Sequence, residues 1–98
     1  MCKTEIKKEL GKYHINYTHE KILRRINENP GITMCELTKG LDLSKGSVSL
    51  CIKRLEEENL IQKYGTFDDK RVFRLHPTKI GKDLCSKIKL IQILKTYK

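Results

Sequence analysis

The sequence predicts a mainly α-helical fold with one small β-hairpin, and three features of its 98 residues support this prediction. Apolar side chains recur at helical spacing along most of the chain. Two segments that start with capping residues follow each other closely in the middle of the chain. After Asn59 the helical spacing gives way to two short runs of strand-forming residues. The length suits a single domain, residues 1–98, rather than two domains.

Two helices are predicted before the middle of the chain. In the first, residues 3–13, the side chains of Ile6, Leu10 and Tyr13 share one face. Residues 14–17 break the pattern, and Thr18 is expected to cap a second helix that runs to residue 29. The sequence Asn-Pro-Gly at 29–31 ends this helix, because proline cannot continue a helix and glycine tolerates a tight turn.

The next two predicted helices lie on either side of a short turn. Thr33 and Glu36 form a capping box at the start of the first, in which the hydroxyl accepts from the Glu36 amide and the carboxylate reaches back. Gly40 and Asp42 mark the end of this helix, and Ser44 caps the one that follows. Two helices joined by such a turn are typical of the helix-turn-helix motif.

Two short strands and a long final helix complete the predicted fold. The strands are expected at residues 60–64 and 72–75, with a polar hairpin tip at 65–71 between them. Pro77 and Thr78 then introduce a helix at about 79–97. This prediction divides the domain into an N-terminal helix at 1–17, a core at 18–78 and a C-terminal helix at 79–98.

The final helix is apolar over more of its surface than one core requires. At about 100° per residue, one stripe consists of Ile80, Leu84, Ile88, Ile91 and Leu94. A second stripe beside it consists of Leu90, Ile93 and Tyr97. Two stripes favour burial against a second subunit as well as against the chain's own core. The alternative is one broad face that lies in a groove of the core.

The helix that Ser44 caps has an unusual outward face. On a helical wheel its inward side carries Val48, Cys51, Ile52 and Leu55. The opposite side carries Gly46 and Leu50, flanked by Ser47, Ser49, Lys53 and Arg54. Such a face fits a DNA major groove, since small residues let the backbone approach, cations reach guanine or phosphate, and a leucine packs on a thymine methyl. The alternative is an ordinary amphipathic helix with one exposed leucine.

Composition narrows the class of function. A net charge of +9 favours an anionic partner such as nucleic acid, although a solvated basic surface is the alternative. The cysteine and histidine residues are scattered without the spacing of metal ligands, so no metal is expected. Catalytic motifs such as a glycine-rich phosphate loop are missing from the sequence, which predicts that the protein is not an enzyme. Without a long apolar run or a signal peptide, a cytoplasmic protein with no membrane contact is expected.

Residues 32–81, ITMCELTKGLDLSKGSVSLCIKRLEEENLIQKYGTFDDKRVFRLHPTKIG, resemble the core of MarR-family transcription regulators. Asp69-Lys70-Arg71 occupies the D-x-R position of that family's wing, and Thr78 and Gly81 match its L-T-x-x-G. The resemblance implies a winged helix-turn-helix with flanking N- and C-terminal dimerisation helices. It also implies that Arg71 reaches the DNA backbone or minor groove, with Asp69 orienting it. Leu50 departs from the arginine common in the family, which leaves the base preference open.

The predicted function is a sequence-specific regulator of transcription that binds double-stranded DNA as a homodimer and represses it. The expected DNA-binding residues are Ser44, Lys45, Gly46, Ser47, Ser49, Leu50, Lys53, Arg54, Lys70 and Arg71, with further phosphate contacts from Lys63 and Arg74. The expected dimer contacts are Ile6, Leu10, Leu84, Ile88 and Ile91. No cofactor is expected, and nothing in the sequence identifies a small-molecule effector. The competing class is a protein-interaction winged helix in which Leu50 anchors another protein.

Overall fold

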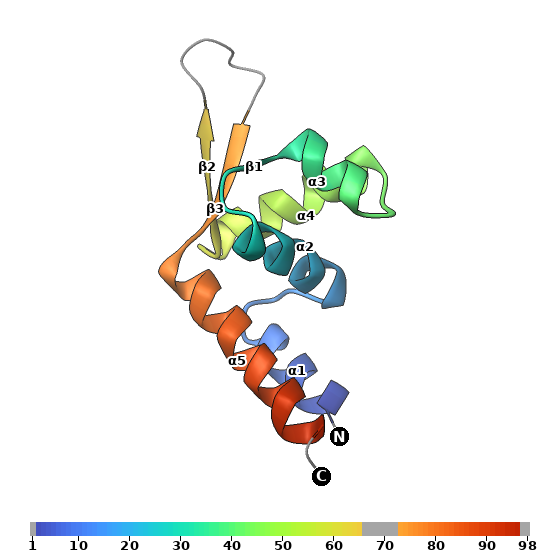
Figure 1. Cartoon of the computed structure of the whole chain (residues 1–98), viewed down its shortest axis with the longest axis vertical. Coiled ribbons are helices and arrows are strands. Elements are labelled where there is room, and N and C mark those ends of the chain that lie inside the picture. The colour runs from blue at the N-terminus through green and yellow to red at the C-terminus, as the bar shows by residue number, and fades with distance from the viewer. Residues whose placement is uncertain (1, 66–72, 97–98) are drawn as a thin grey trace.

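A computed structural model describes residues 2–65 and 73–96 of the chain. The elements within these residues are α1 (Cys2–Gly11), α2 (Tyr17–Glu28), β1 (Ile32–Thr33), α3 (Met34–Gly40), α4 (Lys45–Glu57), β2 (Ile61–Gly65), β3 (Phe73–Pro77) and α5 (Lys79–Thr96). Figure 1 shows α2, α3 and α4 gathered beside the strands, while α1 and α5 extend away from them to the chain ends. Residues 66–71 of the hairpin tip predicted at 65–71, and the predicted end of the last helix at Tyr97, lie outside the described residues.

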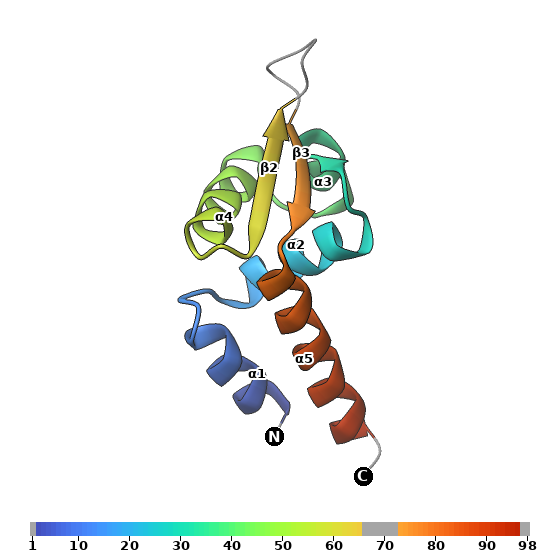
Figure 2. The same cartoon turned by 90° about the vertical axis from the view of Figure 1, so that its left-hand side faces the viewer.

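The strands form one antiparallel sheet in the order β1-β3-β2 (Figure 2). β2 pairs with β3 from Ile61 opposite Pro77 to Gly65 opposite Phe73, so both strands extend one or two residues beyond their predicted ends. β1 was not predicted, because two residues are too short to show a strand period. It nevertheless anchors the start of α3 to the sheet, through the pairing of Ile32 with Leu75.

One apolar core joins all these elements. α2, α3, α4 and β3 each contribute a fully buried leucine: Leu23, Leu37, Leu55 and Leu75. The predicted inward face of α4 is confirmed, since Val48, Cys51, Ile52 and Leu55 are all buried. α4 therefore presents its opposite face to solvent, which is the face that the sequence assigns to DNA.

Three helices start as capping rules require, although one start was placed wrongly. The hydroxyls of Thr33 and Ser44 accept from the amides of Glu36 and Ser47, which confirms both predicted caps. The Glu36 carboxylate accepts from the Thr33 hydroxyl rather than from its backbone. Thr18 is not the cap of α2, because the side-chain oxygen of Asn16 accepts from the Thr18 amide at 2.9 Å and starts the helix two residues earlier than predicted.

His19 completes the cap of α2, and this arrangement predicts a pH dependence. The Nδ1 atom of His19 accepts from the Asn16 amide at 3.0 Å, so it must be unprotonated. Burial, and then the nearby charge of Arg54, lower the pKa of His19 from 6.5. Because the folded-state pKa lies below the unfolded one, this contribution to stability is present above pH 6.5 and is lost as the pH falls through the folded pKa.

The free energy of unfolding should therefore fall between about pH 7.5 and about pH 5.5, and the variant His19→Gln should lose part of that dependence. Urea titrations at the two pH values measure both quantities. The matched control is His14→Gln, because His14 is exposed and lies outside the cap. Equal pH dependence in His19→Gln and the wild-type chain would show that His19 does not carry the effect.

The junction of α4, the sheet and α5 explains the Thr78 and Gly81 positions of the sequence motif. The Thr78 hydroxyl donates to the Asn59 carbonyl at 2.6 Å and accepts from the Gly81 amide at 3.1 Å. The Thr78 amide donates to the carbonyl of Leu60, which lies directly against Gly81. A Cβ atom on Gly81 would overlap this carbonyl oxygen, so glycine is required for the close approach of α5 to the end of α4.

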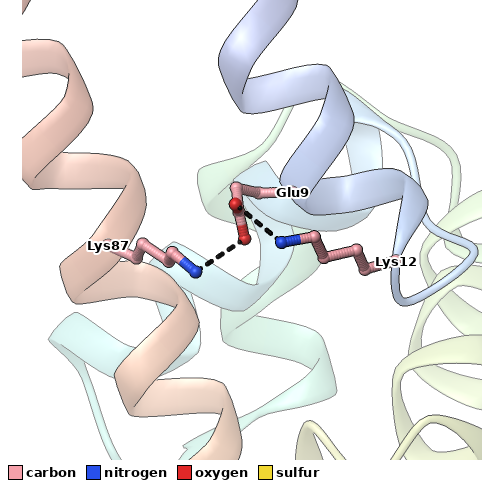
Figure 3. Close-up of polar contacts among 3 residues, drawn as sticks. All are labelled: Glu9, Lys12 and Lys87. Atoms are coloured by element: carbon pink, nitrogen blue, oxygen red, sulfur yellow. Dashed lines mark hydrogen bonds and ion pairs between the residues drawn. The ribbon is translucent and has the colours of Figure 1, made fainter.

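Within one chain, α1 packs along α5. The carboxylate of Glu9 accepts from Lys12 of its own helix and also pairs with Lys87 of α5, each at 3.1 Å (Figure 3). These two ammonium groups lower the pKa of Glu9. Between the helices, Ile6, Leu10, Leu84 and Ile88 are all buried. Within one chain these side chains are at most 5% exposed, so their role as dimer contacts, which stays a prediction, would require a different arrangement of α1 and α5.

The apolar stripes of α5 are also divided differently from the prediction. Leu84, Cys85 and Ile88 face the core and Ile91 is half-buried, because the close contact at Gly81 turns this side of the helix inward. Ile80 and Leu94, which were grouped with Leu84 and Ile88 in the first predicted stripe, are exposed at 46% and 63%. Together with Leu90 and Ile93 they form an exposed apolar stripe, which we call the α5 stripe. The second apolar face predicted for this helix therefore exists, with partly different members.

Candidate nucleic-acid interface

The outward face of α4 is open to solvent along its whole length. Leu50 has 71% of its surface exposed, and no heavy atom lies within 4 Å of the position that a Cβ on Gly46 would take. The other predicted DNA-binding residues of this helix are exposed as well: Lys45, Ser47, Ser49, Lys53 and Arg54. This confirms their outward orientation, while the contacts assigned to them stay predictions.

The N-terminal end of this face is ordered by Ser44. Its hydroxyl accepts from the Ser47 amide at 3.2 Å and donates to the Ser47 hydroxyl at 2.9 Å. The cap leaves the two oxygens side by side where the helix dipole is positive, which favours a phosphate nearby. The two roles predicted for Ser44, cap and phosphate partner, are thus compatible in space, and the structure shows the first of them.

The two flanks of the α4 face adjoin different elements. Arg54 lies on the side of α2, close enough for its charge to disfavour protonation of His19. Lys45, Ser49 and Lys53 lie on the side of α3 and the sheet, where they line two adjoining hollows. The cations are therefore spread across the width of the helix, and on a helical wheel Leu50 lies between Lys53 and Arg54.

The larger of these hollows lies between α3, α4 and the strands and has a volume of about 630 Å³. α3 contributes Met34, Cys35, Thr38 and Lys39. The facing walls are Lys45 and Ser49 of α4, Lys63 of β2 and Phe73 of β3. The adjoining hollow, about 370 Å³, shares Met34, Ser49 and Lys63 and continues along α4 to Leu50, Lys53 and Glu56. We call the two together the wing groove.

Sequence reasoning missed the α3 wall of the wing groove. Cys35, Thr38 and Lys39 lie at i, i+3 and i+4 on a capped helix, so their shared face was readable from the spacing. The prediction placed all contacts of this region on the following helix and on the hairpin. Phe73 could not be found in that way, because only the strand register brings it beside Lys63.

Two cations of the sheet are already engaged within the chain. The guanidinium of Arg74 donates from Nη1 to the Gly31 carbonyl at 3.0 Å, so it ties β3 to the turn before β1. The Nζ atom of Lys63 lies 3.7 Å from a carboxylate oxygen of Glu56 and 4.8 Å from the centre of the Phe73 ring. Glu56 is partly buried and lines the wing groove.

The wing residues that the family resemblance singles out, Asp69, Lys70 and Arg71, lie outside the described residues. Their roles stay predictions. The described strands stop on either side of these residues, since β2 ends at Gly65 and β3 begins at Phe73.

A separate polar hollow of about 380 Å³ lies between α2 and α5. Its wall includes Glu20, whose burial raises the pKa of the carboxyl against the opposing effect of Arg24. Cys85 also borders it, and burial raises the pKa of this thiol to about 11. Burial likewise raises the pKa of Cys51. At neutral pH these two thiols are protonated, so neither is a reactive thiolate.

Three helices, α2, α3 and α4, pack beside an antiparallel sheet, and the last of them is capped and presents one face to solvent. This arrangement defines a winged helix-turn-helix domain. Residues 15–62 match the family model described as winged helix-turn-helix DNA-binding. The fold is also that of MarR, which superposes with a TM-score of 0.81 over 92% of this chain and 66% of MarR at 27% identity. The chain is thus MarR-like, as the sequence resemblance implied.

Two further relatives extend this comparison. The protein YybA of Bacillus subtilis strain 168, an HTH-type transcriptional regulator, is 37% identical over 60 residues. These residues are 61% of this chain but only 40% of YybA, so the chain spans less than half of that relative. The structure of Staphylococcus aureus MepR in complex with DNA has a TM-score of 0.80 and 22% identity over 91% of this chain and 73% of MepR. At that identity, it shows a shared fold.

The described residues contain neither a metal-binding cluster nor a membrane-spanning helix. Groups of three or more histidine, cysteine, aspartate or glutamate side chains arranged to hold a metal ion do not occur in this part of the chain. None of the helices in the described part is long and apolar enough to cross a bilayer.

Proposed function

We propose that this protein is a transcription regulator that binds double-stranded DNA sequence-specifically and acts by binding rather than catalysis. The observation that carries the proposal is the open face of α4, where Gly46, Leu50 and Lys53 stand clear of the chain's own core. Support comes from the match of residues 15–62 to a DNA-binding family and from the shared fold of MepR, which was solved in complex with DNA. We propose that the protein represses transcription by blocking a promoter, and that it acts in the cytoplasm.

We further propose that the protein binds as a homodimer through α5. The α5 stripe is an exposed apolar surface on a helix that extends away from the strands to the C-terminal end of the described chain, and a second copy would bury it. Two α4 helices related by a two-fold axis would meet successive major grooves, roughly 34 Å apart, on a pseudo-palindromic site.

The decisive experiment is selection of bound fragments from random duplex DNA by the purified protein. A consensus with two-fold symmetry is the expected result. Binding of the selected duplex should weaken steeply between roughly 50 and 200 mM salt, with a log–log slope of about −0.9 for each phosphate neutralised. A protein whose Leu50 anchors another protein would instead select no consensus, and its interaction would barely respond to salt.

Lys53→Ala should lower the affinity for the selected duplex by about tenfold, since one cation of the α4 face is lost. Fluorescence anisotropy with labelled duplex measures the change. Lys21→Ala is the matched control, because Lys21 is an exposed lysine of α2 that borders a different hollow, one that no residue of α4 lines. Equal losses in the two variants would mean that general charge, and not the α4 face, holds the DNA.

A further inference from the structure

The wing groove combines cationic and apolar walls in a way that fits a strand of nucleic-acid backbone. Four lysines border it: Lys39, Lys45 and Lys63 line its larger hollow, each from a different element, and Lys53 lines the second. Met34 and Phe73 supply apolar surface beside them. A phosphodiester backbone alternates anionic phosphates with apolar sugar faces, so both kinds of wall have a partner. The groove also runs into the α4 face, since its second hollow is bordered by Leu50 and Lys53.

One acidic side chain interrupts this cationic wall. The Glu56 carboxylate pairs with Lys63 at 3.7 Å, and the same ammonium lies 4.8 Å from the centre of the Phe73 ring. Lys63 is thereby held between a carboxylate and an aromatic face in the free protein. A phosphate that binds Lys63 must replace Glu56 as its partner, and Glu56 is then left without an ion pair beside the charge of the DNA.

We propose that the wing groove receives the phosphodiester backbone of the bound duplex. In the free protein Glu56 forms an ion pair with Lys63, and a phosphate of the DNA takes the place of Glu56 when the duplex binds. This rests on the proposed DNA-binding function and adds to it a second contact surface, the α3 wall, and an internal competitor. The α4 face then reads bases, while the wing groove holds one strand beside it. Glu56 lowers affinity for any duplex, whatever its sequence, because it competes with phosphate alone.

Removing the competitor tests the second half of this proposal. Glu56→Gln should tighten binding of the selected duplex by about two- to fivefold, the range that exposed ion pairs supply. Its salt dependence should also steepen by roughly one phosphate equivalent, because no carboxylate is left to take up a cation when DNA binds. Glu57→Gln is the matched control, since it removes the same charge from the next residue of α4, which is exposed and does not line the groove. Equal changes in affinity and slope in both variants would overturn the role of Glu56.

Cys35 provides a direct test of the groove itself. This thiol is exposed and borders the groove on the α3 wall, while Cys51 and Cys85 are buried. In a Cys2→Ser variant of the full chain, saturating duplex should slow alkylation of Cys35 by N-ethylmaleimide at least about tenfold, as expected for a contact surface that excludes solvent. The reagent is neutral, so repulsion by DNA does not contribute.

The possible results separate this proposal from the proposed function. A duplex that binds while Cys35 reacts at its free rate overturns the backbone site and leaves DNA binding intact. Lys39→Gln supplies an independent measurement. It should make the slope of log affinity against log salt concentration shallower by roughly one phosphate equivalent, whereas Lys21→Gln should leave this slope unchanged. If no duplex binds at all, the proposed function and this inference both fail.

Discussion

Replacing Gly81 with alanine should destabilise the fold by about 3 kcal/mol, the upper part of the range for overpacked sites. The added Cβ would overlap the carbonyl oxygen of Leu60 and would also come within 3.3 Å of the Leu23 side chain. The Leu60 carbonyl cannot move away freely, because it accepts from the Thr78 amide at 3.0 Å. The substitution therefore forces α5 away from the end of α4 and strains the junction that Thr78 caps.

Chemical denaturation measures this loss, and Gly46→Ala is its control. Gly46 is also a helical glycine, but nothing lies within 4 Å of its missing Cβ. Alanine there should raise the free energy of unfolding by up to about 1 kcal/mol through helix propensity alone. If both substitutions stabilise the protein, the close approach of α5 to Leu60 is wrong. Gly46→Ala should also weaken duplex binding, since its methyl group lies on the face assigned to the major groove.

Leu84→Ala should lower the free energy of unfolding by about 2–5 kcal/mol, as for other fully buried leucines. Within a single chain only 2% of the Leu84 surface is exposed, and the side chain packs in the common core. The difference in stability between Leu84→Ala and the wild-type protein should be the same at every protein concentration, because the cavity forms inside one chain. Thermal unfolding at a series of concentrations measures both the loss and its concentration dependence.

Leu90→Ala is the matched variant on the same helix, since Leu90 belongs to the α5 stripe and is 55% exposed. It should weaken self-association in sedimentation equilibrium and leave the stability of the chain within about 0.5 kcal/mol of wild type. The reverse pattern, with normal stability but lost association in Leu84→Ala, would restore Leu84 to the dimer interface that its sequence position suggested.

The sequence was most informative where a local rule decides the structure. Thr33 and Ser44 were predicted as caps from the residues that follow them, and both accept the expected amide. The period of Val48, Cys51, Ile52 and Leu55 predicted the buried side of α4, and with it the exposure of Leu50. The cap of α2 was the exception, because Asn16 and Thr18 are both good capping residues and only the backbone at Asn16 chooses between them.

The local sequence alone therefore determined the helices, the caps of α3 and α4 and the outward face of α4, because those depend on contacts within a few residues. Tertiary structure alone decided the residues that meet across the chain: Lys39 with Lys63 around the wing groove, Glu56 with Lys63, and Leu10 with α5. Periodicity shows which side of a helix is apolar, but not which apolar side chains the chain itself covers. The close packing of α5 at Gly81 settles that division, and a contact between residues as far apart in sequence as Leu60 and Gly81 leaves no period in the sequence.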